Sequence, residues 1–99
     1  MKLQMHSIRF DADVKLLDFI QRKANKLDTF FDRIIDGEVF LRLDNDVQNE
    51  NKIVEIKLNI PGQQLFAKEK AKSFEAAADL SVEALKKQLR KYKEKNFVY

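Results

Sequence analysis

The chain has 99 residues and contains no cysteine. Disulfide bonds, a cysteine nucleophile and thiolate metal ligands are therefore excluded, and the absence fits a reducing compartment. His6 is the single histidine, so no second imidazole is available to form a metal-binding pair. With two glycines and one proline, the chain has no glycine-rich phosphate loop, no linker and no low-complexity stretch.

Long apolar runs are also missing. No stretch approaches the roughly 18 consecutive apolar residues that a membrane span needs, and residues 1–10 lack the apolar segment of a signal peptide. We therefore expect a cytoplasmic protein without a membrane partner. The length suits one domain, residues 1–99, which can bury roughly 65% of the surface exposed by its unfolded chain.

The acidic residues do not form a convincing reactive site. Asp44, Asp46 and Glu50 lie in a polar segment, but their spacing lacks the glycine and the distant bidentate glutamate of an EF-hand loop. No serine has a plausible histidine and aspartate arrangement around it. We expect no enzyme activity, metal, cofactor or small-molecule substrate; an enzyme that uses the acidic segment is a remote alternative.

Positive charge is concentrated near the C-terminus. Residues 84–95 contain six basic residues and one acidic residue, a net charge of +5, whereas the whole chain carries +3. The rest of the chain is therefore net negative. A local excess of this kind suggests an electrostatic footprint for a polyanion such as a nucleic acid.

Hydrophobic periodicity predicts six elements. Alternating apolar and polar residues predict strands, and apolar stripes at helical spacing behind the N-cap candidates Asp13 and Ser73 predict helices. Pro61 and Gly62 fit the centre of a type II turn. The expected order is strand 2–9, helix from about 13 to 31, strands 38–44, 52–60 and 63–72, and helix from about 74 to 95.

This β-α-β-β-β-α order predicts a single α+β domain. Each helix has one apolar stripe, so both helices are expected on the same face of a four-stranded mixed sheet. The first helix should connect parallel neighbours with a right-handed crossover, and the last three strands should form an antiparallel meander. The other face of the sheet should be wetter.

The final helix carries the most informative charge pattern. At about 100° per residue, its apolar stripe includes Leu85 and Leu89, and basic residues fall together on an adjoining side. Grouped cations of this kind match a phosphate backbone. Equally, they could belong to a solvated helix end, where lysines interact favourably with the negative C-terminal end of the helix dipole. The basic group comprises Lys86, Lys87, Arg90 and Lys93, with Lys91 just beyond.

The first helix shows a weaker version of this pattern. Lys15, Arg22, Lys23 and Lys26 project within about a third of its circumference. If the helices lie side by side, the two basic sets could frame one groove. Ordinary helix surface with pairs such as Asp18 and Arg22 is the favoured interpretation of this helix alone.

Other outward residues of the sheet suggest different roles. Lys68, Lys70 and Lys72 could guard an exposed strand against edge-to-edge aggregation. Phe40 and Phe66 are expected on the wetter face, where they could stack on bases or contact a protein. A rival hypothesis is therefore a protein–protein adaptor that modulates a transcription factor through this face.

Two segments resemble a known family. Residues 26–34, KLDTFFDRI, are similar to the end of the first helix in ribosome hibernation-promoting factors, and residues 84–95, ALKKQLRKYKEK, resemble that family's final-helix signature. Ala76, Ala77 and Asp79 match the start of the same helix. The element order also matches, so the resemblance covers the whole chain. The family is also called the ribosome-associated inhibitor or sigma-54 modulation family.

The resemblance implies a translation inhibitor. Members of this family bind the small ribosomal subunit near the decoding centre, where they exclude messenger RNA and tRNA and store ribosomes in stationary phase or starvation. Basic residues of both helices contact ribosomal RNA. Matched position by position, the candidates are Lys23, Lys26, Lys87, Lys91 and Lys93. Arg22, Lys86 and Arg90 join them from helix geometry alone.

One departure from the family concerns its second domain. Many members carry a C-terminal domain that pairs ribosomes, but this sequence ends at 96–99 without one. We therefore expect a short form consisting of a single ribosome-binding domain. Assistance in ribosome dimerisation and silencing of single ribosomes both remain open.

Overall fold

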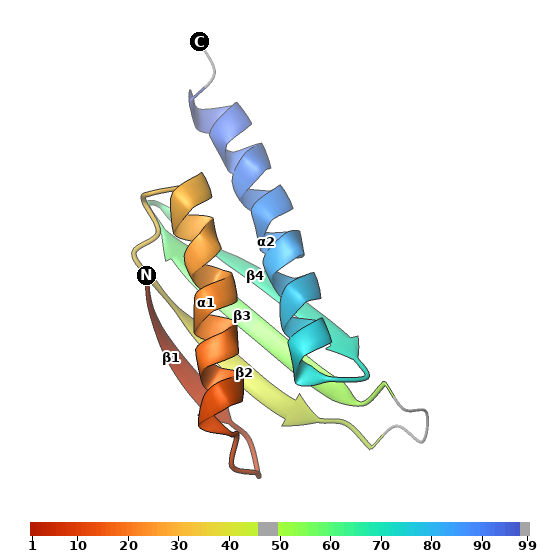
Figure 1. Ribbon diagram of the computed structural model, residues 1–99. Helices are drawn as coiled ribbons and strands as arrows, with labels where there is room; N and C mark the ends of the chain where they lie inside the picture. The colour runs from red at the N-terminus through yellow and green to blue at the C-terminus, as the bar shows by residue number, and fades with distance from the viewer. Residues whose placement is uncertain (46–49, 98–99) are drawn as a thin grey trace.

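The computed structural model describes residues 1–45 and 50–97 and shows two helices packed on one face of a four-stranded sheet (Figure 1). Strand order is β1-β2-β3-β4, with β1 parallel to β2 and the remaining pairs antiparallel. The predicted α+β fold, with both helices on the same side, is confirmed. The elements are β1 (Lys2–Ser7), α1 (Val14–Phe30), β2 (Asp36–Leu43), β3 (Lys52–Ile60), β4 (Gln63–Ala71) and α2 (Phe74–Phe97).

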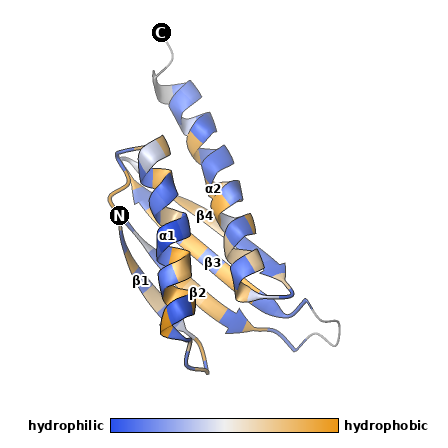
Figure 2. Cartoon of the chain, in the orientation of Figure 1, coloured by the Kyte–Doolittle hydropathy of each residue, from blue (hydrophilic) through white to orange (hydrophobic). Residues whose placement is uncertain are grey.

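The core lies between the sheet and the helices. Alternation places apolar residues of neighbouring strands opposite one another, as at Val39 and Ile56 and at Ile56 and Ala67. These side chains pack against the apolar stripes of the helices, where Ile20 and Leu85 are fully buried. In Figure 2 the hydrophobic colour accordingly lies on the strands beneath the helices.

Close packing at the start of β2 depends on a glycine. A Cβ at Gly37 would lie 2.7 Å from the Lys57 carbonyl oxygen and 2.8 Å from side-chain atoms of Leu3 and Leu58. Strands β1 and β3 therefore approach β2 closely at this point. Gly62 has a different role: its φ of 82° is the conformation that the second central residue of a type II turn requires, as the sequence predicts.

Both predicted N-caps are present. Asp13 accepts a hydrogen bond from the Lys15 backbone N–H at 3.1 Å, and the Ser73 hydroxyl accepts one from the Ala76 N–H at 3.0 Å. Each cap satisfies a backbone donor that has no partner inside its helix. Directly after these caps, α1 begins at Val14 and α2 at Phe74.

Other boundaries shift by a few residues. Strand β1 ends at Ser7 rather than residue 9, because Arg9 has a φ of 65° and turns the chain toward α1. Strand β2 begins at Asp36, two residues early, where it pairs with Asn59. Strand β4 ends one residue early, at Ala71, and α2 continues to Phe97. Of the predicted polar loop, residues 46–49 lie outside the described residues.

Helix α2 is longer than the layer it covers. Its 24 residues correspond to roughly 36 Å at 1.5 Å per residue, and its C-terminal turns project beyond the end of α1 and beyond the sheet (Figure 1). Among residues 74–95 of this helix, Leu89 is the last that is fully buried. The projecting part is mostly hydrophilic in Figure 2, so it lies in solvent rather than in the core.

Candidate nucleic-acid interface

Helices α1 and α2 lie side by side and enclose a groove. Its volume is about 380 Å³, and its floor includes Leu27 from α1 and Val82 from α2, both buried. We call it the interhelical groove. The remaining lining residues are Lys23, Lys26, Thr29, Phe30, Asp79, Glu83 and Lys86. Basic residues of two helices thus frame a single groove, as the positions of these residues on a helical wheel suggest.

The charges in the interhelical groove are only partly neutralised. The Lys23 ammonium lies 3.0 Å from a carboxylate oxygen of Asp79 and so links the two helices. Within residues 1–45 and 50–97, Lys26 and Lys86 have no carboxylate partner within 4.0 Å. These two ammonium groups are therefore available to an anionic ligand.

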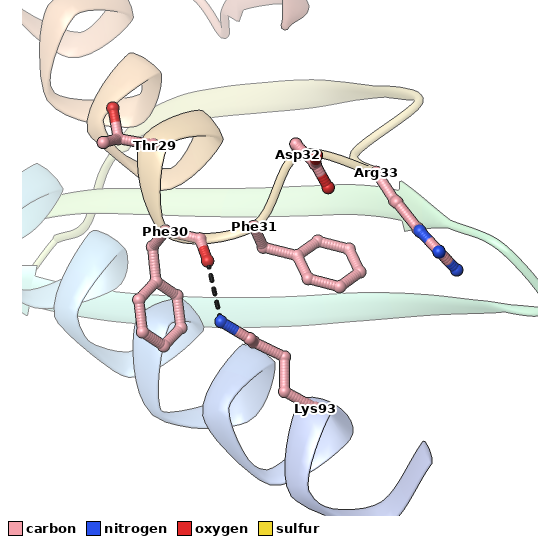
Figure 3. A pocket seen from close by; sticks show the side chains of 6 residues that line it. All are labelled: Thr29, Phe30, Phe31, Asp32, Arg33 and Lys93. Carbon is pink, nitrogen blue, oxygen red and sulfur yellow. Dashed lines mark hydrogen bonds between the residues drawn. The ribbon is translucent and has the colours of Figure 1, made fainter. Parts of the chain in front are cut away.

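A second hollow, of about 350 Å³, lies at the C-terminal end of α1 (Figure 3). The Lys93 ammonium donates a hydrogen bond to the Phe30 carbonyl oxygen at 3.1 Å. The last carbonyls of a helix lack partners within the helix, so this lysine completes the end of α1. The hollow is lined by Thr29, Phe30, Phe31, Asp32, Arg33 and Lys93.

The ring of Phe30 lies where the two hollows meet. Ammonium groups of Lys86 and Lys93 approach its centroid at 5.7 and 4.5 Å. Phe30 is half-buried, whereas its neighbour Phe31 belongs to the core. Sequence reasoning missed this residue; its wheel position, off the apolar stripe and close to that of Lys26, was the available signal.

The cations of α2 occupy more than one side of the helix. Lys87 and Arg90 are exposed, but Lys91 and Lys95 line a separate hollow of about 280 Å³ on the β4 side, beside Tyr92. The positive charge therefore wraps around the projecting end of α2. Lys86, Arg90 and Lys93 recur at helical spacing on one side of α2, and Lys86 and Lys93 of these contact Phe30.

Arg22 also lies apart from the groove. It is exposed on α1 and lines a different hollow with Lys15, Asp18 and Gln21. Of the eight predicted RNA contacts, Lys23, Lys26 and Lys86 come together in the interhelical groove. Lys93 lines the adjacent hollow at the C-terminal end of α1. The structure thus gathers half of the predicted set and leaves the others on exposed helix surface.

The open face of the sheet is a mosaic of paired charges around Phe40. The Phe40 ring stacks on His6 with centroids 4.9 Å apart, and cations of Arg42 and Lys57 lie 5.7 and 5.4 Å from its centroid. Neighbouring side chains therefore cover part of this ring. His6 is paired with Glu38 at 3.1 Å. Phe66, in contrast, is 45% exposed.

One residue of this face differs from its expected environment. Glu55, predicted on the wetter face, is only 8% exposed. Its carboxylate lies 3.5 Å from Arg42 Nε and 4.0 Å from Lys68 Nζ, and these two long side chains shield it from water. The charges of this face are therefore largely used within the protein.

Groups able to perform chemistry are sparse. Among the described residues, no three histidine or carboxylate side chains are close enough to hold a metal ion. The Lys70 ammonium donates a hydrogen bond to Asp44, and this bond holds the pKa of that carboxyl below its ordinary value. Asp44 forms this ion pair on the surface, just after the end of β2. Its lowered pKa therefore indicates a structural ion pair rather than a catalytic group. None of the helices in the described ranges is long and apolar enough to cross a membrane.

The structure is thus a small α+β domain with a pair of basic helices on one face of its sheet. Residues 3–96 match the family described as Sigma 54 modulation protein / S30EA ribosomal protein. The chain belongs to this family.

Two relatives illustrate the match. The chain is 34% identical over 92 residues to a ribosome hibernation promotion factor of Deinococcus radiodurans, covering 91% of this chain and 48% of that protein. The chain thus spans about half the length of this relative. It is 30% identical over 95 residues to a ribosome hibernation promoting factor of Klebsiella oxytoca, covering 96% of both proteins.

Solved structures show the same fold. A ribosomal subunit interface protein from Coxiella burnetii aligns with a TM-score of 0.83 at 24% identity, covering 94% of this chain and 98% of that chain. The N-terminal domain of Thermus thermophilus Protein Y aligns with a TM-score of 0.80 at 22% identity, covering 93% and 99%.

Proposed function

We propose that this protein binds ribosomal RNA of the small ribosomal subunit, occupies the decoding region and holds ribosomes in an inactive, hibernating state. The observation that carries the proposal is the set of unneutralised cations on two adjacent helices, centred on the interhelical groove. Relatives named as ribosome hibernation factors support this assignment. The protein acts sterically and performs no reaction.

Phosphate contacts supply the affinity in this mechanism. Five cations of the two helices have no carboxylate partner within the described ranges: Lys26 and Lys86 at the groove, Lys87 on α2, and Arg90 and Lys91 on its projecting part. When such side chains neutralise the phosphates of an RNA backbone, the RNA releases its condensed counterions, and this release favours binding. Specificity then comes from the fit of two helices to one RNA shape.

Lys23 and Lys93 have a second role. Lys23 is paired with Asp79, and Lys93 completes the end of α1. Both remain proposed RNA contacts because their side chains also line the two hollows. Their structural contacts make them poor choices for a test of binding, since their replacement also changes how α1 and α2 are held together.

Binding to isolated small subunits should depend steeply on salt. If about five phosphates are neutralised, log K should fall against log salt concentration with a slope of about −3.5 to −4.5. Raising salt from roughly 50 to 200 mM should then weaken binding by about 10²- to 10³-fold. Co-sedimentation at fixed magnesium measures the slope, because magnesium competes for the same phosphates.

A shallow slope would contradict the electrostatic mechanism. A protein that stays in the light fractions at every salt concentration would contradict ribosome binding altogether and favour the adaptor hypothesis. In that case Phe66, the most exposed ring of the open sheet face, is the contact to test first.

Occupation of the decoding region makes a separate prediction. Small subunits loaded with messenger RNA and P-site tRNA should release this protein or fail to bind it, because the ligands would share one space. Competition co-sedimentation measures the effect, and subunits loaded with neither ligand are the control. Simultaneous saturation by all three would place the binding site elsewhere on the subunit.

A further inference from the structure

We propose that the ring of Phe30 is a stacking platform for one unpaired RNA base, flanked by lysines that hold that nucleotide's phosphate. This inference deepens the proposed function and rests on it. It assigns a recognition role to a residue outside the cationic set. It also makes the surface selective for RNA that has an unpaired nucleotide next to the part of the RNA against which the two helices fit.

Phe30 is the last residue of α1, and its ring lines both the interhelical groove and the hollow at the helix end. The next residue provides a contrast. Phe31 is buried, and its ring meets Tyr92 edge-on with centroids 5.5 Å apart. In the part of the chain that the structure describes, Phe30 has no aromatic partner of this kind. Phe31 belongs to the core, whereas Phe30 packs only against the edge of the core, so part of its ring stays open to a ligand.

The surroundings of Phe30 suit a nucleotide. Its ring points from α1 toward α2, and Lys93 reaches it from the opposite helix (Figure 3). The Lys86 and Lys93 ammonium groups lie 5.7 and 4.5 Å from its centroid. Cations and base faces both stack on aromatic rings. A base on this ring would bring its own phosphate within reach of the same flexible ammonium groups.

The two hollows have the capacity for such a ligand. Their volumes, about 380 and 350 Å³, fall at the lower end of the roughly 300–1,000 Å³ typical of small-ligand sites. Of the acidic residues that line the two hollows, Asp79 is paired with Lys23, whereas Asp32 and Glu83 are exposed. The cations that surround the ring favour a ligand with both an aromatic face and negative charge, which a nucleotide provides and an apolar peptide does not.

Replacement of Phe30 separates stacking from charge. We expect Phe30→Leu to weaken binding to purified small subunits by about 5- to 150-fold, the range for loss of one base–aromatic stack. The slope of log K against log salt should stay unchanged, because leucine removes no charge. Phe30→Tyr keeps a flat ring and should bind within about threefold of the wild type. Phe66→Leu, which removes a ring from the opposite face, is the matched control and should have no effect.

Each other outcome overturns the inference. If Phe30→Leu keeps a native circular dichroism spectrum and binds with wild-type affinity, Phe30 is not a stacking platform, but the proposed function is not contradicted. Equal weakening by Phe30→Leu and Phe30→Tyr, or a flattened salt slope, assigns Phe30 the role of positioning Lys86 and Lys93 instead. If Phe30→Leu does not fold, the affinity of Phe30→Tyr and Phe30→Trp decides, since loss of binding by both folded variants excludes stacking. Failure of the wild type to bind small subunits removes both proposals.

Discussion

Reversal of charge at Lys87, Arg90 and Lys91, each to glutamate, should abolish co-sedimentation with small ribosomal subunits. All three side chains are exposed on α2, and none has an ion-pair partner within the described ranges. A charge-assisted contact contributes roughly 1.5–3 kcal/mol, so three lost contacts weaken binding by more than about 10³-fold. Repulsion between glutamate and phosphate adds to this loss.

A second triple variant controls for net charge. Lys2, Lys15 and Lys72 are equally exposed but lie on β1, at the start of α1 and between β4 and α2. Their reversal to glutamate takes the formal net charge from +3 to −3, as in the first variant. We expect this control to bind within about tenfold of the wild type at 0.15 M salt, where the Debye length is about 8 Å and distant charges are screened.

Circular dichroism makes the comparison decisive. Like-charge neighbours on an exposed helix cost only about 0.2–0.5 kcal/mol per pair, so both variants should retain the native spectrum. Equal losses of binding in the two variants would indicate a general charge effect. Retention of binding by a folded Lys87, Arg90 and Lys91 variant would show that α2 does not supply the dominant contacts.

Leu89→Ala should lower the free energy of unfolding by about 2–5 kcal/mol. Leu89 is fully buried on α2. Truncation removes apolar contacts and leaves a cavity in a small core that cannot easily collapse around it. For a domain of this size, the melting temperature should fall by more than about 8 °C. Urea unfolding with an unchanged m-value measures the effect as a loss of stability.

Leu80→Ala is the matched control on the same helix. The Leu80 side chain is 48% exposed, so its truncation should change stability by no more than about 0.5 kcal/mol. The contrast tests the buried face of α2 independently of helix propensity, because both variants replace leucine by alanine. Comparable destabilisation by the two changes would mean that the orientation of α2 is wrong.

The fold follows from patterns that are strong and local. Val54, Ile56 and Leu58 alternate along a strand that pairs on both sides, so the inward face is evident from the sequence. Asp13 and Ser73 mark the helix starts by the same kind of local chemistry. Boundaries at Ser7 and Asp36 are harder to predict, because they depend on a positive φ at Arg9 and on pairing with a distant strand.

The interface is only partly predictable because its geometry depends on tertiary contacts. A helical wheel shows that Lys23 and Lys86 each flank the apolar stripe of their helix, but not that Lys23 meets Asp79 across the groove. Nor can it show that Lys93 completes the end of α1 or that Phe30 lies between two lysines. Each of these contacts joins residues far apart in the chain, and no local period encodes such a pairing.

The overhang of α2 has a consequence for hydrogen exchange. Amides near Leu85 belong to a segment of α2 that packs against β3, β4 and α1. Their protons should therefore exchange only when the whole domain unfolds. Beyond Leu89 the helix keeps contacts through Tyr92, which meets Phe31, and Lys93, which meets Phe30, but it has no fully buried side chain among residues 90–95. Residues 90–95 should therefore fray more readily and exchange their amide protons faster than residues near Leu85. These residues carry four of the six basic side chains of residues 84–95. RNA that neutralises their mutual repulsion would also suppress this fraying, so bound protein should show slowed exchange along the overhang.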